Sequence, residues 1–316
     1  MIVEVVTPAP RGSRKGNRIT ALRWARILRR LGHRVRLRTS YQGADAALIV
    51  VLHARHGHAA LVAAKAAAPT RPVILALTGT DLYVDGVLDP RVAESIERAD
   101  VIVTLQPRAV DALPAAVRDK ARVVRQSCTP PPIDPSPDPS AFEVVVVGHL
   151  RPVKDPLLTA RASRRLPASS RIRVTQIGEA LSPEDADAAR AEEVANPRYR
   201  WLGGRPRRET LERITRARAL VLTSRAEGGA QVVSEALACG TPVIATRIDG
   251  VFGLVGDDWP ALFPVGDDVA LARLLARAES DESFLADLTG RARALAPLYH
   301  PDAEVEAWRR LLEDVG

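Results

Sequence analysis

The sequence has 316 residues, of which 46% are hydrophobic, 26% charged and 4% aromatic, and its formal net charge is +7. No apolar run approaches the roughly 18 residues that a membrane-spanning helix needs, and no basic leader precedes a long apolar region, which predicts a soluble protein of the cytoplasm. Cys128 and Cys239 are too few for a disulfide framework and lack the spacing of a zinc site, which also favours a reducing compartment.

The basic residues argue against nucleic acid as a partner. Of the 45, 41 are arginine and four are lysine, scattered among 38 acidic residues, and no nucleic-acid-binding signature accompanies them. Residues 1–128 carry 21 basic and 10 acidic residues, a net of +11, whereas the remainder has a net of −4. A basic first half is suited to an anionic small molecule, although chance drift of surface charge explains the asymmetry equally well.

Runs rich in Val, Ile and Leu alternate with helical patterns in the first part of the chain, as in βαβ units of a parallel sheet. The strands are predicted at residues 2–7, 34–39, 47–53, 72–78, 101–105 and 122–126. The clearest helix spans 18–31, with Asn17 as its cap, an apolar stripe that includes Leu22 and Leu28, and Gly32 as its stop. The proline-rich stretch 129–139 then marks a domain boundary, which gives an N-terminal domain of residues 1–134.

A second α/β series follows and predicts a C-terminal domain of residues 135–316. Its strands are expected at 142–147, 172–177, 219–223 and 242–246, and its helices from about 156, from 183, at 230–239 and at about 302–314. The last of these helices can pack back on the N-terminal domain. Two doubly wound α/β domains in tandem are expected to face each other across a cleft where a ligand binds.

Strand 142–147 runs into a motif that suits a diphosphate. Gly148 allows close approach of a ligand, and Arg151 and Lys154 stand three residues apart just ahead of a predicted helix. Two cations and the positive end of a helix dipole together can neutralise a diphosphate. The alternative is an exposed turn with ordinary basic residues.

The second motif is the segment Glu227-Gly228-Gly229-Ala230 and the helix after it. Glu227 lies in the loop and Glu235 two turns into the helix. Carboxylates accept hydrogen bonds from vicinal sugar hydroxyls, and the backbone amides of a glycine-rich helix start suit a phosphate or sugar oxygen. A surface helix can carry two glutamates by chance, but the order strand, glycine-rich turn and helix, together with the motif of Gly148, Arg151 and Lys154, makes chance an improbable explanation.

Together these motifs resemble the donor site of GT-B glycosyltransferases of the family-4 type. The resemblance implies that Arg151 and Lys154 bind the diphosphate beside Gly148, that Glu235 binds the ribose, and that Glu227 and the amides of 228–230 bind the donor sugar. Arg151, Lys154 and Glu227 would then be the catalytic residues. Gly229-Ala230 stands where the family commonly has Phe-Gly, and Leu77 to Tyr83 lacks the histidine that the family often has there.

A closer resemblance is to the selenosugar synthases of selenoneine biosynthesis. It lies in residues 7–17, 76–83, 148–156 and 227–230. It implies transfer from a UDP-sugar, such as UDP-N-acetylglucosamine or UDP-glucose, to selenophosphate, an anionic soft nucleophile that needs no general base. The acceptor-binding residues would be Gly12, Ser13, Arg14, Lys15, Asn17, His53, Thr78, Thr80 and Asp81. The alternative for 12–17 is an ordinary loop with solvated charges.

The sequence predicts no metal and no bound cofactor. His53 ends a strand, and His56 and His58 lack nearby carboxylates or cysteines, so a metal cluster is not expected. Three rival functions stay open: a glycosyltransferase with a hydroxyl acceptor, a UDP-sugar epimerase and a non-catalytic nucleotide-sugar sensor. A dinucleotide oxidoreductase is disfavoured because no Gly-x-Gly-x-x-Gly follows a first strand. The oligomeric state stays open.

Overall fold

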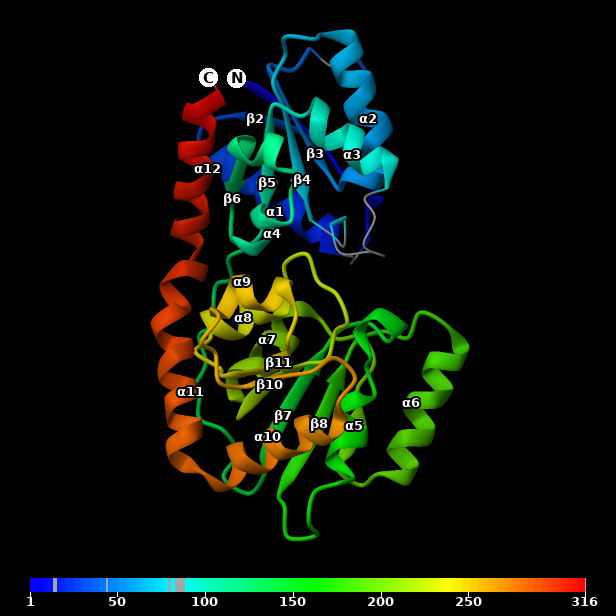
Figure 1. Cartoon of the computed structure of the whole chain (residues 1–316), viewed down its shortest axis with the longest axis vertical. Coiled ribbons are helices and arrows are strands. Elements are labelled where there is room, and N and C mark those ends of the chain that lie inside the picture. Colours follow the sequence, from blue (N-terminus) through cyan, green and yellow to red (C-terminus); the bar gives the residue numbers. More distant parts are fainter. Residues whose placement is uncertain (14–15, 44, 79–80, 83–88, 316) are drawn as a thin grey trace. The chain divides into compact units, whose positions relative to one another are not determined.

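The computed structural model describes residues 1–13, 16–43, 45–78, 81–82 and 89–315. The chain forms two compact units, each built on a six-stranded parallel sheet (Figure 1). The first unit comprises Met1–Gln126, Glu227–Gln231 and Pro301–Gly316, and the second comprises Ser127–Ala226 and Val232–His300. The chain therefore enters the second unit at residue 127, ahead of the boundary expected at 134 and 135, and returns to the first unit twice.

The first unit contains strands that match the apolar runs of the sequence. Its elements are β1 (Ile2–Val6), α1 (Gly16–Arg30), β2 (Arg34–Arg38), β3 (Leu48–Leu52), α2 (Ala54–Ala67), β4 (Val73–Leu77), α3 (Pro90–Arg98), β5 (Val101–Thr104), α4 (Arg108–Asp111), the 3-10 helix η1 (Ala115–Lys120), β6 (Ala121–Val123) and α12 (Pro301–Val315). Separate apolar clusters cover the two faces of its sheet, because each buried strand presents alternate side chains to opposite faces.

Helix α1 shows where the sequence prediction succeeded and where it was wrong. Gly32, with φ +89°, ends the helix as predicted, and the His33 amide bonds to the Leu28 carbonyl in a Schellman motif. The helix begins at Gly16, so Asn17 lies inside it and is not its cap. Leu22, which belongs to the predicted stripe, is 38% exposed, whereas Trp24 is fully buried. The buried face of the helix therefore differs from the predicted stripe and consists of Thr20, Ala21, Trp24, Ala25, Ile27 and Leu28.

Helix α12 packs on α1 within the first unit. The rings of Trp24 and Trp308 meet edge to face at 5.0 Å, and both side chains are fully buried. The buried carboxylate of Glu304 accepts hydrogen bonds from Trp24 Nε1 at 2.8 Å and from Arg23 Nε at 3.1 Å. A carboxylate that is buried with a cation and an indole donor keeps its bonding satisfied, so α12 is an integral part of the core of the first unit.

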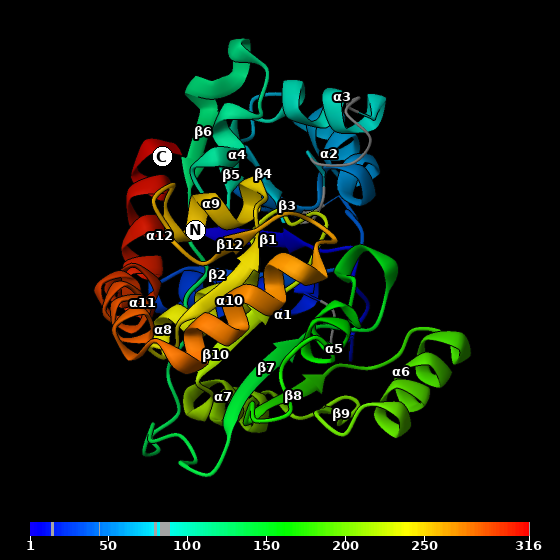
Figure 2. The same ribbon diagram turned by 60° about the horizontal axis from the view of Figure 1, so that its bottom comes forward.

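The second unit contains more helices. Its elements are β7 (Phe142–Val147), the 3-10 helix η2 (Pro152–Lys154), α5 (Leu158–Ser163), β8 (Ile172–Ile177), α6 (Pro183–Ala195), β9 (Tyr199–Trp201), α7 (Arg207–Arg216), β10 (Ala219–Leu222), α8 (Gln231–Ala238), β11 (Val243–Thr246), α9 (Asp249–Val255), β12 (Leu262–Phe263), α10 (Asp268–Ser280), α11 (Glu282–Leu295) and the 3-10 helix η3 (Ala296–Tyr299). Figure 2 shows α10 and α5 packed together on one face of its sheet.

The strand orders locate one reversal point in each sheet. The first sheet has the order β2-β1-β3-β4-β5-β6, so the chain reverses its direction of winding between β1 and β3. The second has the order β12-β11-β10-β7-β8-β9, with the reversal between β7 and β10. Ligands of doubly wound sheets bind outside the carboxyl ends of the strands at such a reversal.

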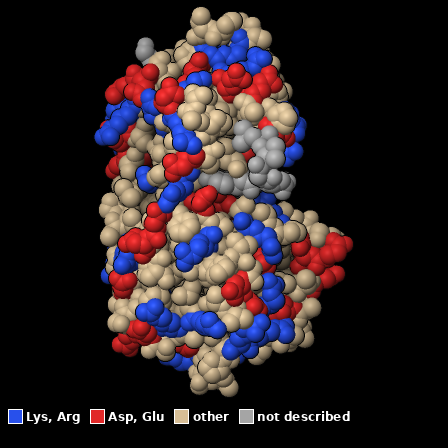
Figure 3. Space-filling model, in the orientation of Figure 1, with Lys and Arg blue, Asp and Glu red and all other residues tan. Residues whose placement is uncertain are grey.

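Two expectations from the sequence concern partners: that the chain binds no nucleic acid and that it does not cross a membrane. On the face shown in Figure 3, basic and acidic side chains are both present over the whole surface, with basic ones gathered across its lower part. In the described part of the chain, none of the helices combines the length and the apolar run that a bilayer crossing requires.

Candidate functional site

The loop after β7 lies at the reversal point of the second sheet. Gly148 is held against Gly178 so closely that a Cβ on Gly178 would stand 1.9 Å from the Gly148 carbonyl oxygen. A Cβ on Gly148 would lie 3.8 Å from Cδ of Lys154, so the stem of this lysine passes beside the glycine. The structure therefore brings together Gly148 and Lys154, two of the residues expected to bind the donor.

The basic residues of this loop are fixed through the backbone. Arg151 is exposed and precedes η2, and the Lys154 amide bonds to the Arg151 carbonyl at 2.9 Å. The hydroxyl of Thr223, just after β10, donates to the Lys154 carbonyl at 2.8 Å. Both predicted cations thus stand on one short turn that is tied to the neighbouring strand across the reversal point.

His149 follows Gly148 and was not among the predicted site residues. Its Nδ1 accepts a hydrogen bond from the Glu179 amide at 3.2 Å, so in the neutral ring the proton sits on Nε2. Burial lowers the pKa of His149, and the charges of Arg151 and Lys154 lower it further, against the opposing effect of Glu179. Both effects favour the neutral ring beside the two cations.

Glu235 is buried on α8 and is paired with a residue that the sequence did not single out. Arg207 at the start of α7 holds its Oε1 at 2.8 Å and donates to Cys128 Sγ at 3.7 Å. The Cys128 thiol also shares a hydrogen bond with Cys239, which raises the pKa of Cys128 and lowers that of Cys239. Both thiols are free. A cation, a carboxylate and two thiols thus form one cluster from three parts of the chain: Cys128, Arg207, and the helix α8 with its end.

The segment Glu227–Gln231 belongs to the first unit. A Cβ on Gly229 would lie 2.5 Å from Cβ of Leu105, next to the end of β5, so only glycine fits at this position. Gly228 and Ala230 are buried, whereas Glu227 is half-buried. The residues expected to bind the donor therefore form two groups, with Gly148, Arg151, Lys154 and Glu235 in the second unit.

The loop after β1 lies at the reversal point of the first sheet. Gly12 has φ +85°, a conformation that favours glycine, and the Ser13 amide bonds to the Pro10 carbonyl at 3.1 Å. Asn17 Oδ1 accepts the Thr78 hydroxyl at 2.7 Å, which joins the start of α1 to the end of β4. Arg14, Lys15 and Thr80, also expected at the acceptor site, lie outside the described residues.

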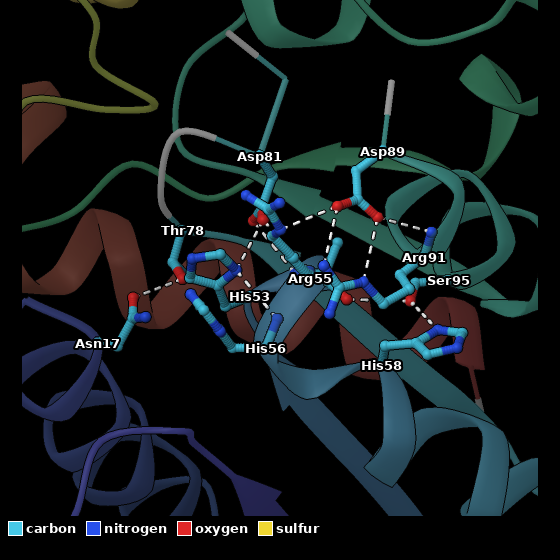
Figure 4. A network of polar contacts seen from close by, with 11 residues as sticks. Asn17, His53, Arg55, His56, His58, Thr78, Asp81, Asp89, Arg91 and Ser95 are labelled. Atoms are coloured by element: carbon cyan, nitrogen blue, oxygen red, sulfur yellow. Dashed lines mark hydrogen bonds and ion pairs between the residues drawn. The ribbon is translucent and has the colours of Figure 1, made fainter. Parts of the chain in front are cut away.

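His53, directly after β3, forms an ion pair with Asp81 when its ring is protonated (Figure 4). Its Nδ1 lies 2.7 Å from Asp81 Oδ1, and the Asp81 side chain is 1% exposed. The same nitrogen faces a second group, the His56 amide, which is a donor at 3.5 Å. Because the Asp81 carboxylate only accepts and is the nearer of the two, Nδ1 is assigned the proton and donates it to Asp81. Nε2 is then the nitrogen that exchanges a proton or contacts a ligand.

Asp81 also fixes the backbone around this histidine. Its two carboxylate oxygens accept the amides of Ala54 at 3.2 Å and Arg55 at 3.3 Å, at the first turn of α2. His53 itself has φ +73°, which is rare for a residue with a side chain and is retained only where the surroundings enforce it. Sequence reasoning listed both residues but gave no signal for their pairing.

The other two histidines have separate surroundings. The His56 ring lies edge to face with that of His53 at 4.4 Å, and burial together with the neighbouring ring lowers the pKa of His56. His58 contacts the Ser95 hydroxyl at 3.1 Å and Glu94 at 3.3 Å. Within the ranges that the structure describes, no three His, Cys, Asp or Glu side chains are grouped to hold a metal ion.

Solved structures identify the fold of this chain. HepE from Anabaena, in complex with UDP-glucose, has a TM-score of 0.79 at 17% identity and covers 99% of this chain and 100% of its own. Sucrose-phosphate synthase from Thermosynechococcus elongatus has a TM-score of 0.77 at 15% identity, with coverages of 100% and 99%. These identities show the fold alone, and it is the GT-B fold, as the sequence predicted.

Sequence comparison then gives the family. Residues 135–295, just over half of the chain, match the family described as glycosyl transferases group 1, and the chain belongs to this family. The D-inositol 3-phosphate glycosyltransferase of Segniliparus rotundus is 34% identical over 157 residues, which are 45% of this chain and 34% of that protein. The same-named protein of Mycobacterium sp. (strain KMS) is 35% identical over 136 residues, or 42% and 30%. These matches span about a third of the relatives' length.

Proposed function

We propose that this chain is a cytoplasmic glycosyltransferase that moves the sugar of a UDP-sugar onto selenophosphate, with UDP-N-acetylglucosamine or UDP-glucose as donor. The selenium of selenophosphate forms a bond to the anomeric carbon, the bond from that carbon to the β-phosphate oxygen breaks, and UDP leaves with the electron pair. The product of this step is a sugar that carries selenium at its anomeric carbon with the phosphoryl group still attached. Transfer of that phosphoryl group to water, which breaks the Se–P bond, would leave the selenosugar for selenoneine biosynthesis.

The donor half of the proposal is carried by the turn after β7. It stands at the reversal point of a sheet with the strand order of nucleotide-binding folds, and it presents Arg151 and Lys154 beside Gly148. Negative charge grows on the β-phosphate as UDP departs, and preorganised cations stabilise that charge. Glu235 would bind the ribose, and Glu227 with the amides of 228–230 the sugar. HepE, which shares the fold, was solved with UDP-glucose.

The acceptor half is supported by residues 7–17 and 76–83, which carry the resemblance to selenosugar synthases. Of these segments, the described residues 7–13 follow β1, and Thr78 directly follows β4, at the carboxyl edge of a sheet in the more basic part of the chain. Gly12, Ser13, Arg14, Lys15 and Asn17 would hold the anion, with Thr78, Thr80 and Asp81 beside them. Selenophosphate is ionised at neutral pH and needs no base to attack.

A specific observation favours a second candidate, a hydroxyl acceptor. The pair of His53 and Asp81 has the geometry of an oriented base, because Asp81 accepts from Nδ1 and Nε2 stays available for a proton. The curated relatives are named as D-inositol 3-phosphate glycosyltransferases. An alcohol loses a proton as it attacks, so this acceptor class would use the pair directly.

The deciding experiment is mass spectrometry of the products from a panel of UDP-sugars, each incubated with selenophosphate, with inositol 3-phosphate, or with no acceptor. A selenium-containing sugar formed only with selenophosphate supports the proposal, and a reaction without enzyme controls for direct chemistry. A phosphoinositol glycoside and no selenosugar would make the hydroxyl acceptor the correct reading. Tight UDP binding with no product in any arm would indicate a sensor.

A further inference from the structure

The turn that carries Arg151 and Lys154 ends in an unusual residue. Asp155 has φ +40° and ψ 57°, the left-handed conformation that residues other than glycine rarely adopt and that Asp and Asn adopt most readily. Asp155 as a whole is only 8% exposed. An acidic residue is therefore buried in a rare backbone conformation, one position after the lysine expected to bind the diphosphate.

The carboxylate of Asp155 joins two arginines from different elements. Oδ1 lies 3.0 Å from Nη2 of Arg161 on α5, and Oδ2 lies 3.0 Å from Nη2 of Arg225, three residues after the end of β10. The Arg225 amide also bonds to the Val153 carbonyl at 2.8 Å. With the bond from Thr223 to the Lys154 carbonyl, three contacts tie this turn to the strand end across the reversal point.

We propose that Asp155 is a positioning residue for the donor diphosphate, and that its ion pair with Arg225 holds Lys154 in place. This proposal rests on the proposed function, since it assumes that Lys154 contacts the diphosphate. The turn carries the two cations but is only a 3-10 turn, which has poor hydrogen-bond geometry of its own. Its precision therefore comes from the ion pair and the two backbone bonds to the β10 end.

Substitutions at Asp155 separate the carboxylate from the backbone conformation. Asp155→Asn keeps the size and the tolerance for the left-handed region but loses the ion pairs, and Asp155→Gly frees the backbone and also loses them. If the carboxylate matters, both variants lower kcat by about tenfold to a hundredfold, because a small misplacement of a catalytic group has effects of that order. If only the backbone matters, both variants keep wild-type kcat, and the proposal is wrong.

Arg225→Ala tests the other side of the ion pair without a change inside the turn, and Arg225 is exposed enough that folding should survive. We expect Arg225→Ala to lower kcat about as much as Asp155→Asn does, and Arg225→Lys to restore part of that loss. The double variant of Asp155→Asn and Arg225→Ala should have a kcat no lower than that of either single variant. Arg165→Ala is the matched control, since Arg165 is similarly exposed and pairs with Asp268 at 3.0 Å, away from the turn. Effects of Asp155→Asn and Arg225→Ala that multiply would overturn the coupling.

Two further readouts separate positioning from general stability. The Kd for UDP and the melting temperature of each variant are measured alongside kcat for UDP release from the UDP-sugar, with the acceptor that supports turnover. Asp155→Asn added to Lys154→Ala should lower kcat by no more than about twofold beyond Lys154→Ala alone, because Asp155 acts through Lys154. Wild-type kcat in Lys154→Ala would refute the donor site itself, whereas a low kcat there with full additivity would refute only the role of Asp155.

Discussion

Each unit has a histidine just after a strand at its reversal point, and the Nδ1 atoms of these two histidines have opposite roles. His53 follows β3 at the first reversal point and donates its Nδ1 proton to the carboxylate of Asp81, whereas His149 follows β7 at the second and accepts a backbone amide at Nδ1. The Asp81 carboxylate fixes which ring nitrogen of His53 carries the proton, whereas burial and the charges of Arg151 and Lys154 lower the pKa of His149. The first reversal point is thus built around a proton-bearing pair and the second around fixed cations.

The contrast between the two histidines depends on an intact first unit, and the packing of α12 on α1 can be tested directly. Trp308→Ala removes a fully buried ring that packs on Trp24, so we expect a loss of about 3–5 kcal/mol in the free energy of unfolding. Trp308→Phe is the control: among the described residues Nε1 of Trp308 has no hydrogen-bond partner, so Phe should cost much less. Urea denaturation measures both, and an equal loss in the two variants would contradict the packing argument.

The fixed cations of the second unit should dominate catalysis. Arg151→Ala and Lys154→Ala should each lower kcat by on the order of 100-fold or more, equivalent to about 3 kcal/mol, because the charge on the β-phosphate is largest in the transition state. Binding of the UDP-sugar should weaken less than turnover. Steady-state kinetics combined with calorimetry of UDP binding separates these effects, and wild-type kcat in either variant would remove the residue from the site.

The first reversal point should distinguish the acceptor classes. With selenophosphate, neutralising Arg14 and Lys15 together should raise the acceptor KM by about tenfold or more, because the contacts of these two cations with the anion are lost. The UDP-sugar KM should stay nearly unchanged. His53→Ala should cost less than that double change. If His53→Ala instead abolishes turnover while the double variant keeps its acceptor KM, the His53–Asp81 pair is a base and the hydroxyl acceptor is correct.

The neutral histidine of the second unit predicts a modest dependence of stability on pH. Because the pKa of His149 is lower in the folded chain, the unfolded chain binds the proton first as the pH falls below about 6.5. His149 therefore contributes stability above that pH that is lost progressively on acidification. His149→Asn keeps an acceptor for the Glu179 amide, so between pH 7.5 and 5.5 its denaturation midpoint should fall less than that of the wild type.

The smallest expected effect is that of chelation. The proposed mechanism uses Arg151, Lys154 and a helix start to balance the charge of the leaving UDP, so it predicts that activity survives dialysis against EDTA. Rates measured before and after dialysis provide the test. Activity that disappears and returns only with an added divalent ion would show that the cations of the second unit are not sufficient.

The sequence predicted the parts of this fold that depend on local pattern. The apolar runs located β1, β7 and β8, Gly32 marked a helix end, and the helix expected from Pro183 begins there. The strands β9 and β12 were not predicted, because three and two residues are too few to show an alternating pattern. The strand expected at 122–126 is shorter, at Ala121–Val123.

The missing parts of the candidate site depend on contacts between distant residues. Asp155 was visible as the neighbour of Lys154, but its partner Arg225 lies 70 positions away. The cluster of Cys128, Arg207, Glu235 and Cys239 also joins segments that share no local pattern. Composition and spacing show which residue types are available, whereas the pairing of His53 with Asp81 requires the order of β3 and β4 in the sheet.

The position of α12 has a consequence for synthesis of the protein on the ribosome. The strands of the first unit emerge early, but the helix that covers Trp24 and brings Glu304 to it is translated only after the whole second unit. Domains generally fold as units during translation, yet here the apolar face around α1 stays uncovered until the final helix is made. Until α12 is made, the first unit therefore lacks the helix that packs on Trp24, and its core cannot be completed before translation of the second unit.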